Sequence, residues 1–418
     1  MKVPYQPQLL REIAKQNGTP TYVYFEDIIR DRCRKLKDKV SLLPNKLLYA
    51  MKANYNPAIL KIICEEGIGI DAVSIGELEL AKRVGFAPED VLYSANSITD
   101  EEMYVAAEYG SLFNIGELYR LERFGSAFPG SDVCIRLNPR IGAGHHEYVV
   151  TAGEKSKFGI PMEHVTHVLE IANKYNLNII GIHQHIGSGI LDIADLWSAV
   201  EVLLEAAPHF QDLTFINFGG GLGIPYRIGE ASFDYDGFQQ VLIPRIKEWA
   251  EKNGKQLAFW FEPGRYFVAE SGVLLTEVTM LKKNGIGSRT FAGTNSGQNH
   301  LIRPMFYDAY HEIFNLTNPT GILYNYDVTG NICESGDRFA KDRPIQEIRV
   351  NDILAILDAG AYGYAMSSLY NLRPLPEEVL AKSDGRTITV RKRVSPSDLI
   401  EQLISETTDD DTPTTAQP

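Results

Sequence analysis

Lys52 closely follows an apolar run at residues 47–50, in the stretch KLLYAMKANY. A lysine at the mouth of a buried strand is either an ordinary surface residue that begins a loop or an amine held in a cleft. In a cleft, partial desolvation activates the amine, and its commonest covalent role is to form an imine with a carbonyl compound. The other polar residues of the chain decide between these two interpretations.

A run of glycines in FGGGLGIPY also follows an apolar run. Gly219, Gly220 and Gly221 offer backbone N–H groups with no Cβ in the way, which close contact with a phosphate requires. A dinucleotide-binding fingerprint is the alternative, but the run lacks that motif's third glycine and its flanking βαβ unit. The stretch HIGSG adds Gly187 and Ser188 as further phosphate donors.

Two histidines and a carboxylate complete this set of residues. His183 and His185 stand two apart on an expected strand, so they point to the same side, but no third ligand for a metal stands at suitable spacing. One imidazole can pack on a flat cofactor ring, with the other as a core histidine. Glu262, buried at a strand end, must be paired or bound to a cation. A protonated pyridine nitrogen would serve, and a structural pair with Arg265 is the alternative.

Alternating apolar runs and amphipathic stretches predict the elements that carry these residues. Eight strand–helix units over roughly 230 residues match a (β/α)8 TIM-like barrel, an α/β fold, and a doubly wound open sheet is the alternative. The sequence TDEE at residues 99–102 predicts a capping box at the start of one helix. The expected strands are residues 47–50, 69–74, 91–95, 111–115, 133–138, 179–186, 214–218 and 258–262.

A barrel places its catalytic groups at the carboxyl ends of the strands. Lys52 follows the first expected strand, Asp71 and Ser74 close the second, the histidines end the sixth, and Glu262 ends the eighth. The glycine run follows the seventh. All of them therefore lie at one rim, which favours a lysine held in a cleft.

The sequence beyond residue 275 is rich in segments typical of β-strands, such as LLTEVTML and TITVRKRV. We predict a barrel domain at residues 28–275 and a β-rich domain formed by residues 1–27 and 276–405. The polar, proline-bearing end predicts a disordered tail at residues 406–418.

Composition excludes several classes of partner. The net charge of −13 over 418 residues argues against nucleic acid and against an anionic membrane surface, although a local arginine cluster could still bind an acidic small molecule. No apolar run approaches the ~18–20 residues needed to span a bilayer. The N-terminus lacks the apolar stretch of a signal peptide, so we expect a cytoplasmic protein. The four cysteines form no CxxC pair, which is neither a zinc signature nor a disulfide framework.

A lysine, a phosphate cradle, a ring-stacking histidine and a carboxylate are four needs of one cofactor, pyridoxal 5'-phosphate. A carboxylate at the ring nitrogen makes the ring an electron sink for a carbanion at the α-carbon of an amino acid. Lys52 is therefore predicted to hold this cofactor as an imine and to release it to an amino-acid substrate.

Several stretches of the chain carry a family resemblance, among them YAMKANYN, HIGSG, NFGGGLGIPY, EPGRYFVAE, NHLIRPMFYDAYH, ICESGD and DAGAYGYAMSSLYNLRP. Between residues 20 and 395 the chain resembles the fold-type III pyridoxal-phosphate decarboxylases, and most of all the diaminopimelate decarboxylases. The resemblance implies an alanine-racemase-like fold and a homodimer whose active sites are completed across the interface. It also implies decarboxylation of meso-2,6-diaminopimelate to L-lysine and CO2, the last step of lysine biosynthesis.

The resemblance also assigns roles to residues. Lys52 would bind the cofactor covalently, His185 would stack on its ring, and Glu262 would pair with the ring nitrogen. Cys333 and Glu334 would come from the partner chain, with Cys333 as the proton donor to the α-carbon; a buried small residue is the alternative for Cys333. The other cofactor-binding residues would be Asp71, Gly187, Ser188, Gly219, Gly220, Gly221, Gly264, Arg265 and Tyr362.

Substrate choice would depend on a second set of side chains. In LIRPMFYDAY the Arg303 guanidinium suits a two-point grip on a distal carboxylate, and a purely structural arginine is the alternative. A site built to pair a carboxylate also rejects analogues that lack it. The substrate-binding set would be Arg265, Arg303, Tyr307, Glu334 and Tyr362.

Two features depart from the family pattern and leave the substrate open. Leu369 and Leu372 stand where more polar residues are expected, and the loop after the fifth strand carries His145 and His146. Decarboxylation of another amino acid or of a carboxylated polyamine is therefore one alternative function. An alanine-racemase-like isomerase would place an arginine near the ring nitrogen, against Glu262. A non-catalytic cofactor-binding barrel would lack the second domain.

Overall fold

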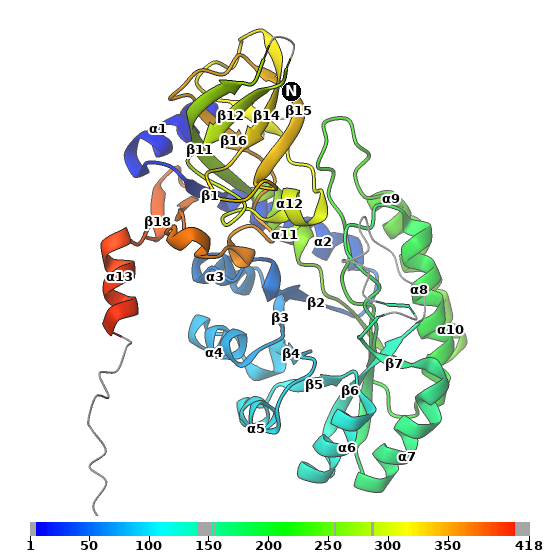
Figure 1. Cartoon of the computed structure of the whole chain (residues 1–418). Coiled ribbons are helices and arrows are strands. Elements are labelled where there is room, and N and C mark those ends of the chain that lie inside the picture. The colour runs from blue at the N-terminus through cyan, green and yellow to red at the C-terminus, as the bar shows by residue number, and fades with distance from the viewer. Residues whose placement is uncertain (1–5, 140–151, 154–155, 255, 286–287, 406–418) are drawn as a thin grey trace, which may run out of the picture.

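The computed structural model describes residues 6–139, 152–153, 156–254, 256–285 and 288–405 (Figure 1). Eight parallel strands form a closed barrel, because β10 pairs with β2 and β5 pairs with both β4 and β6. The barrel strands are β2 (Asn45–Ala50), β3 (Gly69–Ala72), β4 (Val91–Tyr93), β5 (Leu112–Ile115), β6 (Asp132–Asn138), β8 (Asn178–His183), β9 (Phe215–Asn217) and β10 (Ala258–Phe261). A short additional strand, β7 (Ile160–Pro161), pairs with β6.

Every one of the eight expected strands overlaps one of these barrel strands, so the prediction of a closed barrel is confirmed and the open-sheet alternative is wrong. The sixth strand is shorter than expected. It ends at His183, and His185 lies in the following loop rather than on the strand. Both side chains still line the same cavity.

The helices outside the barrel start and stop where local sequence dictates. In α5, Thr99 accepts a hydrogen bond from the Glu102 N–H, and the Glu102 carboxylate accepts one from the Thr99 N–H, which confirms the predicted capping box. In α4, Ser74 caps the first turn and Gly85, in the left-handed region, ends the last. The helices of the barrel region are α2 (Glu26–Val40), α3 (Pro57–Glu65), α4 (Ile75–Val84), α5 (Asp100–Tyr109), α6 (Leu118–Ala127), α7 (Val165–Tyr175), α8 (Ile193–Ala206), α9 (Tyr235–Gly237), α10 (Ile243–Lys252) and α11 (Arg265–Val268).

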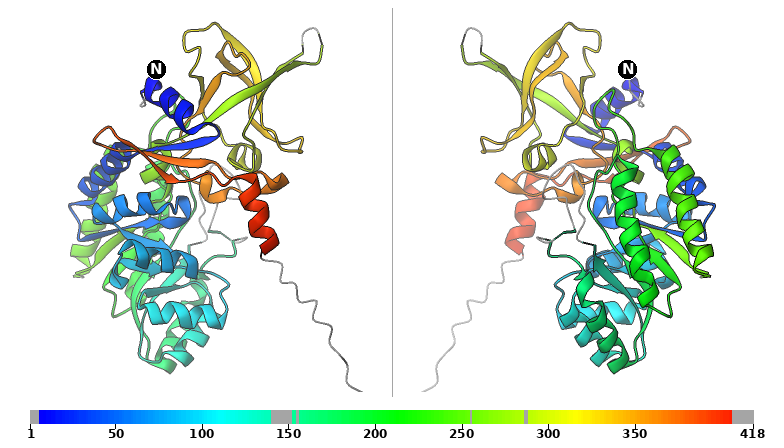
Figure 2. Two further views of the ribbon diagram at one scale, coloured as in Figure 1. Left: turned by 90° about the vertical axis from the view of Figure 1, so that its left-hand side faces the viewer. Right: turned by 90° about the vertical axis from the view of Figure 1, so that its right-hand side faces the viewer.

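A second sheet lies beside the barrel (Figure 2). One of its inner strands comes from the N-terminal part of the chain: β1 pairs antiparallel with β11 and parallel with β17. The strands are β1 (Thr21–Phe25), β11 (Gly272–Lys283), β12 (Thr290–Thr294), β13 (Ile313–Asn315), β14 (Leu323–Thr329), β15 (Arg338–Gln346), β16 (Ile353–Ile356), β17 (Glu377–Ala381) and β18 (Thr387–Arg391). The accompanying helices are α1 (Pro7–Asn17), α12 (Arg303–Tyr307) and α13 (Pro396–Ser405).

The two parts of the chain meet beside the loop that carries Lys52. The N–H of Tyr362 donates to the carbonyl of Ala53 at 2.8 Å, and the Asn54 side chain donates to the carbonyl of Gly360 at 3.0 Å. The second sheet therefore contributes directly to the barrel rim. The domain boundaries at residues 28 and 275 stay a prediction.

Some expectations fall outside the described residues, namely His145, His146 and the tail at 406–418. Within the described part of the chain, each helix is too short or too polar to traverse a bilayer.

Candidate active site

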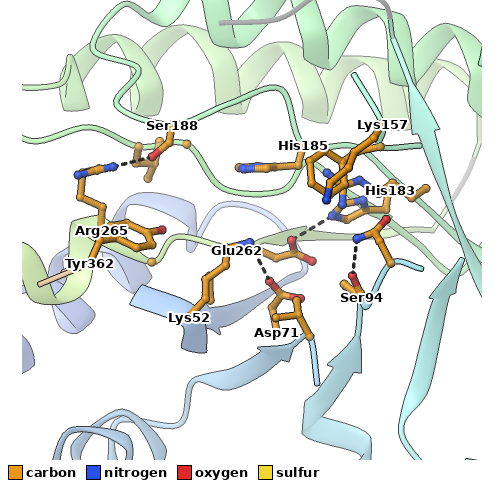
Figure 3. A pocket seen from close by; sticks show the side chains of 18 residues that line it. Lys52, Asp71, Ser94, Lys157, His183, His185, Ser188, Glu262, Arg265 and Tyr362 are labelled. Carbon is orange, nitrogen blue, oxygen red and sulfur yellow. Dashed lines mark hydrogen bonds and ion pairs between the residues drawn. The ribbon is translucent and has the colours of Figure 1, made fainter. Parts of the chain in front are cut away.

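A cavity of about 290 Å³ lies at the carboxyl ends of the barrel strands (Figure 3). Many of the residues singled out in the sequence line it together, although they are spread from residue 52 to residue 362. They are Lys52, Asp71, His185, Ser188, Gly221, Glu262, Gly264, Arg265 and Tyr362. The barrel thus brings Lys52, two carboxylates and a cluster of donors that includes Lys157 and Arg136 to one place.

Lys52 points into this cavity and keeps 44% of its side-chain surface accessible, whereas Asp71 is buried. Their Nζ and Oδ2 atoms lie 3.9 Å apart. Burial opposes the ammonium charge, but Asp71 together with Tyr362 and Glu262 outweighs burial and raises the pKa of Lys52. Burial, together with the charge of Glu262, raises the pKa of Asp71 to about 6. The amine is therefore held by a carboxylate that itself titrates near neutrality.

Glu262 is held by hydrogen bonds in the interior of the barrel. Its Oε1 accepts from the Asn217 amide at 2.7 Å, and its Oε2 lies 3.0 Å from Nε2 of His183. Burial works against the carboxylate charge, but His183 outweighs it and lowers the pKa of Glu262. No arginine pairs with Glu262 among the described residues, so the structural pair with Arg265 is not formed. A buried, ionised carboxylate faces the cavity beside the lysine.

The three glycines of the run do different things. The N–H of Gly219 donates to the Asn217 side chain at 2.9 Å, and the N–H of Gly220 donates to Nδ1 of His185 at 3.2 Å. Gly221 lines the cavity. A Cβ on Gly219 or on Gly220 would stand 2.2 Å from a backbone carbonyl oxygen, so side chains are excluded there. The run lets the strand ends approach closely, and it orients His185.

Arg265 and its neighbours form the side of the cavity next to Ser188. The Arg265 guanidinium donates to the Ser188 hydroxyl at 3.0 Å and to the Tyr226 hydroxyl at 2.6 Å. Its central carbon also lies 4.9 Å from the centre of the Tyr362 ring. Tyr362 adopts a left-handed backbone conformation with φ of 56°. A non-glycine residue in that conformation is held by its surroundings and often marks a functional site.

Arg303 begins α12 and is buried with 1% of its surface exposed. Its guanidinium lies 4.6 Å from the centre of the Tyr226 ring and 2.8 Å from Nε2 of His311. Nδ1 of His311 lies 2.7 Å from the carbonyl oxygen of Leu357, which fixes the tautomer with its proton on Nδ1. Burial lowers the pKa of His311 well below its usual value. Arg303 does not line the cavity.

The other predicted residues do not line the cavity in the single chain. Tyr307, at the end of α12, is half-buried, while Cys333 and Glu334 are exposed. The N–H of Cys333 donates to the Asn371 side chain at 2.8 Å. Gly187 lies beside Gly221, because a Cβ on Gly221 would stand 2.9 Å from the Gly187 carbonyl oxygen.

Asn217, Tyr226 and His311 had no assigned role in the sequence, and His183 was one of two histidines of which one was expected to pack on the cofactor ring and the other in the core. Asn217 precedes the glycine run and His183 precedes HIGSG by two residues, so their positions at strand ends were available signals. Tyr226 and His311 lie inside the motifs NFGGGLGIPY and NHLIRPMFYDAYH, but their partners are remote in the sequence. Among the described residues, no three histidines, cysteines or carboxylates come together in a way that could hold a metal ion.

Known proteins are similar to this chain in both sequence and fold. Residues 26–269 match the family described as pyridoxal-dependent decarboxylase, pyridoxal binding domain. Diaminopimelate decarboxylase of Methanothermobacter thermautotrophicus is 42% identical, over 93% of this chain and 92% of that protein. A crystal structure of diaminopimelate decarboxylase superposes with a TM-score of 0.89 at 33% identity, over 96% of this chain and 97% of the other.

A second solved structure, diaminopimelate decarboxylase from Helicobacter pylori complexed with L-lysine, has a TM-score of 0.87 at 31% identity. It covers 95% of this chain and 99% of the other. The chain therefore belongs to the pyridoxal-dependent decarboxylases, in their diaminopimelate decarboxylase family.

Proposed function

We propose that this chain catalyses the pyridoxal-phosphate-dependent decarboxylation of meso-2,6-diaminopimelate to L-lysine and CO2. The observation that carries the reaction type is Glu262, a buried carboxylate held ionised by His183 and Asn217 beside Lys52. An anion in this position supports a protonated ring nitrogen, whereas the arginine expected of a racemase would not. The relatives named as diaminopimelate decarboxylases support the choice of substrate.

The residues of the cavity fit the cofactor. Arg265 and Ser188 present a cation and a hydroxyl on one side of the cavity, which Gly221 and Gly264 also line, and this pair suits a phosphate. Lys52 and Glu262 stand on another side, and Nδ1 of His183 is a buried polar atom with no partner among the described residues. When bound, pyridoxal phosphate supplies an electron sink that stabilises negative charge at the substrate α-carbon.

The residues of the chain then have separate tasks. Lys52 would bind the aldehyde carbon of the cofactor through Nζ and yield it to the substrate amine. Asp71 sets the charge of that amine, since it lies 3.9 Å from Nζ. His185, held by the Gly220 N–H, would pack on the ring, while Glu262 would hold the proton on the ring nitrogen.

The substrate would be recognised at its far end. Arg303 is a buried guanidinium with no carboxylate partner among the described residues, and it lies against His311 and the Tyr226 ring. A buried cation without an anion is costly, so this position favours a ligand that brings a carboxylate. Diaminopimelate carries one at its distal end, and L-lysine and L-ornithine do not. Tyr307 and Glu334 would complete this end of the site.

A homodimer would complete the site by bringing in Cys333 and Glu334 of the partner subunit. Both are exposed, and large apolar side chains beside them are exposed as well: Met305 by 41% and Leu372 by 48%. Contacts tie these residues into one surface, since Gly336 lies against Met305 and Cys333 bonds Asn371. Exposed apolar surface of this kind marks an interface. The four free cysteines fit a reducing compartment, and we place the protein in the cytoplasm.

The decisive experiment measures CO2 release by the purified protein with pyridoxal phosphate. The substrates would be meso-diaminopimelate, L-lysine, L-ornithine, L-arginine and carboxynorspermidine, each tested separately. We expect release from diaminopimelate alone. Release from another member of the panel, with none from diaminopimelate, would overturn the role of Arg303 while keeping the reaction type.

A further inference from the structure

Two buried arginines share one tyrosine where the barrel meets the second sheet. Tyr226, in the loop after β9, accepts a hydrogen bond from Arg265 at 2.6 Å through its hydroxyl. The face of the same ring lies beneath the guanidinium carbon of Arg303, 4.6 Å from the ring centre. One phenol therefore contacts α11 and α12 at once.

The two cations need such a partner. Arg265 and Arg303 are 5% and 1% exposed, and neither forms an ion pair with a carboxylate among the described residues. Like charges held close together in the interior repel one another and resist burial. A phenol offers two electron-rich surfaces, the oxygen lone pairs and the ring face. Arg265 donates to the oxygen and lies 5.7 Å from the ring centre, whereas Arg303 lies closer over the ring, at 4.6 Å.

Arg303 is also fixed from its other side. His311 Nε2, the unprotonated nitrogen of the ring, accepts from Arg303 at 2.8 Å. The edge of the His311 ring meets the Tyr226 ring at 75°, with the centres 5.3 Å apart. The Arg303 guanidinium is thus held between a ring face and an imidazole nitrogen, in a single orientation.

We propose that Tyr226 is a positioning residue that orients both arginines, Arg265 chiefly through its hydroxyl and Arg303 chiefly through its ring. Its hydroxyl holds Arg265 beside Ser188, on the phosphate side of the cavity, and its ring holds Arg303 for the distal carboxylate of the substrate. This inference rests on the proposed function, which assigns these two arginines to the cofactor and to the substrate.

The two parts of the side chain can be removed separately. Tyr226→Phe keeps the ring and deletes the acceptor of Arg265, so the dissociation constant of the apoprotein for pyridoxal phosphate should rise roughly 10-fold, with KM for diaminopimelate changed less than about threefold. Tyr226→Leu also deletes the ring. It should weaken binding of meso-diaminopimelate to the cofactor-loaded protein a further ~10-fold, and leave L-lysine binding as in Tyr226→Phe, because L-lysine lacks the second carboxylate.

Tyr310→Phe is the matched control. The Tyr310 ring also contacts two arginines, Arg227 at 4.1 Å and Arg343 at 3.6 Å, and its hydroxyl donates to Glu312 at 2.9 Å. It does not line the cavity. We expect the constants of Tyr310→Phe for binding pyridoxal phosphate, meso-diaminopimelate and L-lysine to stay within about twofold of wild type. Thermal melting would be recorded for every variant.

The outcomes separate cleanly. Unchanged cofactor affinity in Tyr226→Phe would show that the hydroxyl does not position Arg265. Equal additional losses for diaminopimelate and L-lysine in Tyr226→Leu would show that the ring does not act through Arg303. If wild type releases no CO2 from diaminopimelate, the proposed function fails, and the cofactor titration of Tyr226→Phe still decides the Arg265 half of the inference.

Discussion

Glu262 and His183 stand at the ends of strands that are not neighbours in the barrel, yet their side chains meet at 3.0 Å. Asn217, on the strand between them, holds the other oxygen of the same carboxylate. This three-strand arrangement keeps a negative charge in the barrel interior, where an isolated carboxylate would become protonated. It explains how one buried group could support a positively charged ring nitrogen.

Replacing Glu262 by Gln should remove this charge with little change in shape. We expect kcat for diaminopimelate to fall by about 10²–10³, equivalent to roughly 3–4 kcal/mol of transition-state stabilisation. Steady-state CO2 release measures it, and Glu277→Gln, on β11 outside the cavity, is the control. A variant whose kcat stays within about threefold of wild type would remove Glu262 from this role.

Lys52→Ala should abolish covalent binding of the cofactor, because it removes the amine that lies 3.9 Å from Asp71. Lys157 also lines the cavity, but among the described residues it forms no ion pair with Asp71. The absorbance band of the imine near the edge of the visible range should disappear, and kcat/KM should fall at least ~10³-fold, about 4 kcal/mol. Lys46→Ala, at the opposite end of the same strand, should keep the band. Persistence of the band in Lys52→Ala would exclude Lys52 as the attachment point.

The stability of the cofactor-free protein should depend on Asp71 and pH. Burial raises the pKa of Asp71 from 3.8 to about 6, so the folded chain binds this proton more tightly than the unfolded chain. The resulting stabilisation is complete below the unfolded pKa and is lost as the pH rises through about 6. The free energy of unfolding of Asp71→Asn, relative to wild type, should therefore increase by up to ~3 kcal/mol between about pH 4 and pH 7.

Urea denaturation across that pH range checks the Asp71 prediction. Asp398→Asn, in α13 away from the cavity, should follow the wild-type pH dependence. A constant difference between Asp71→Asn and wild type would mean that the Asp71 carboxyl titrates alike in the folded and unfolded chains.

Arg303→Gln should weaken recognition of the far end of the substrate. We expect KM for diaminopimelate to rise roughly 10–100-fold, since a hydrogen bond to a charged group contributes about 1.5–3 kcal/mol. The cofactor dissociation constant should change little. Arg349→Gln, an exposed arginine paired with Glu347, is the control. An unchanged KM would leave Arg303 with a structural role only.

A shared active site predicts complementation between two inactive subunits. Lys52→Ala and Cys333→Ala should each be inactive as pure proteins, because the proposed site takes Lys52 from one chain and Cys333 from its partner. Mixing them in equal amounts with subunit exchange should restore about a quarter of wild-type activity, from mixed dimers with one intact site. Cys64→Ser, on α3, should be fully active alone. No recovery on mixing, with exchange verified, would place both residues in one subunit's site.

The barrel strands, and the residues at their carboxyl ends, could be predicted from the sequence because the alternation of apolar and polar residues and the turn signals are local. Lys52, Asp71 and Glu262 were found in this way, since each stands directly at or after the end of a strand that the pattern predicts. The glycine run was also found, but two of the N–H groups predicted to bind phosphate donate to side chains of the protein instead. These side chains are Asn217 and His185, which no spacing rule reveals.

The sequence by itself determined the barrel, the second sheet and the group of reactive residues at one rim, because periodicity and strand ends depend only on near neighbours in the chain. Only the tertiary structure decided the partnerships: His183 and Asn217 on Glu262, and Tyr226 between Arg265 and Arg303. Those pairs that are joined by hydrogen bonds are separated by 39 to 79 residues along the sequence. They exist because barrel closure and the docking of the second sheet bring distant segments together, and local pattern carries no information about that.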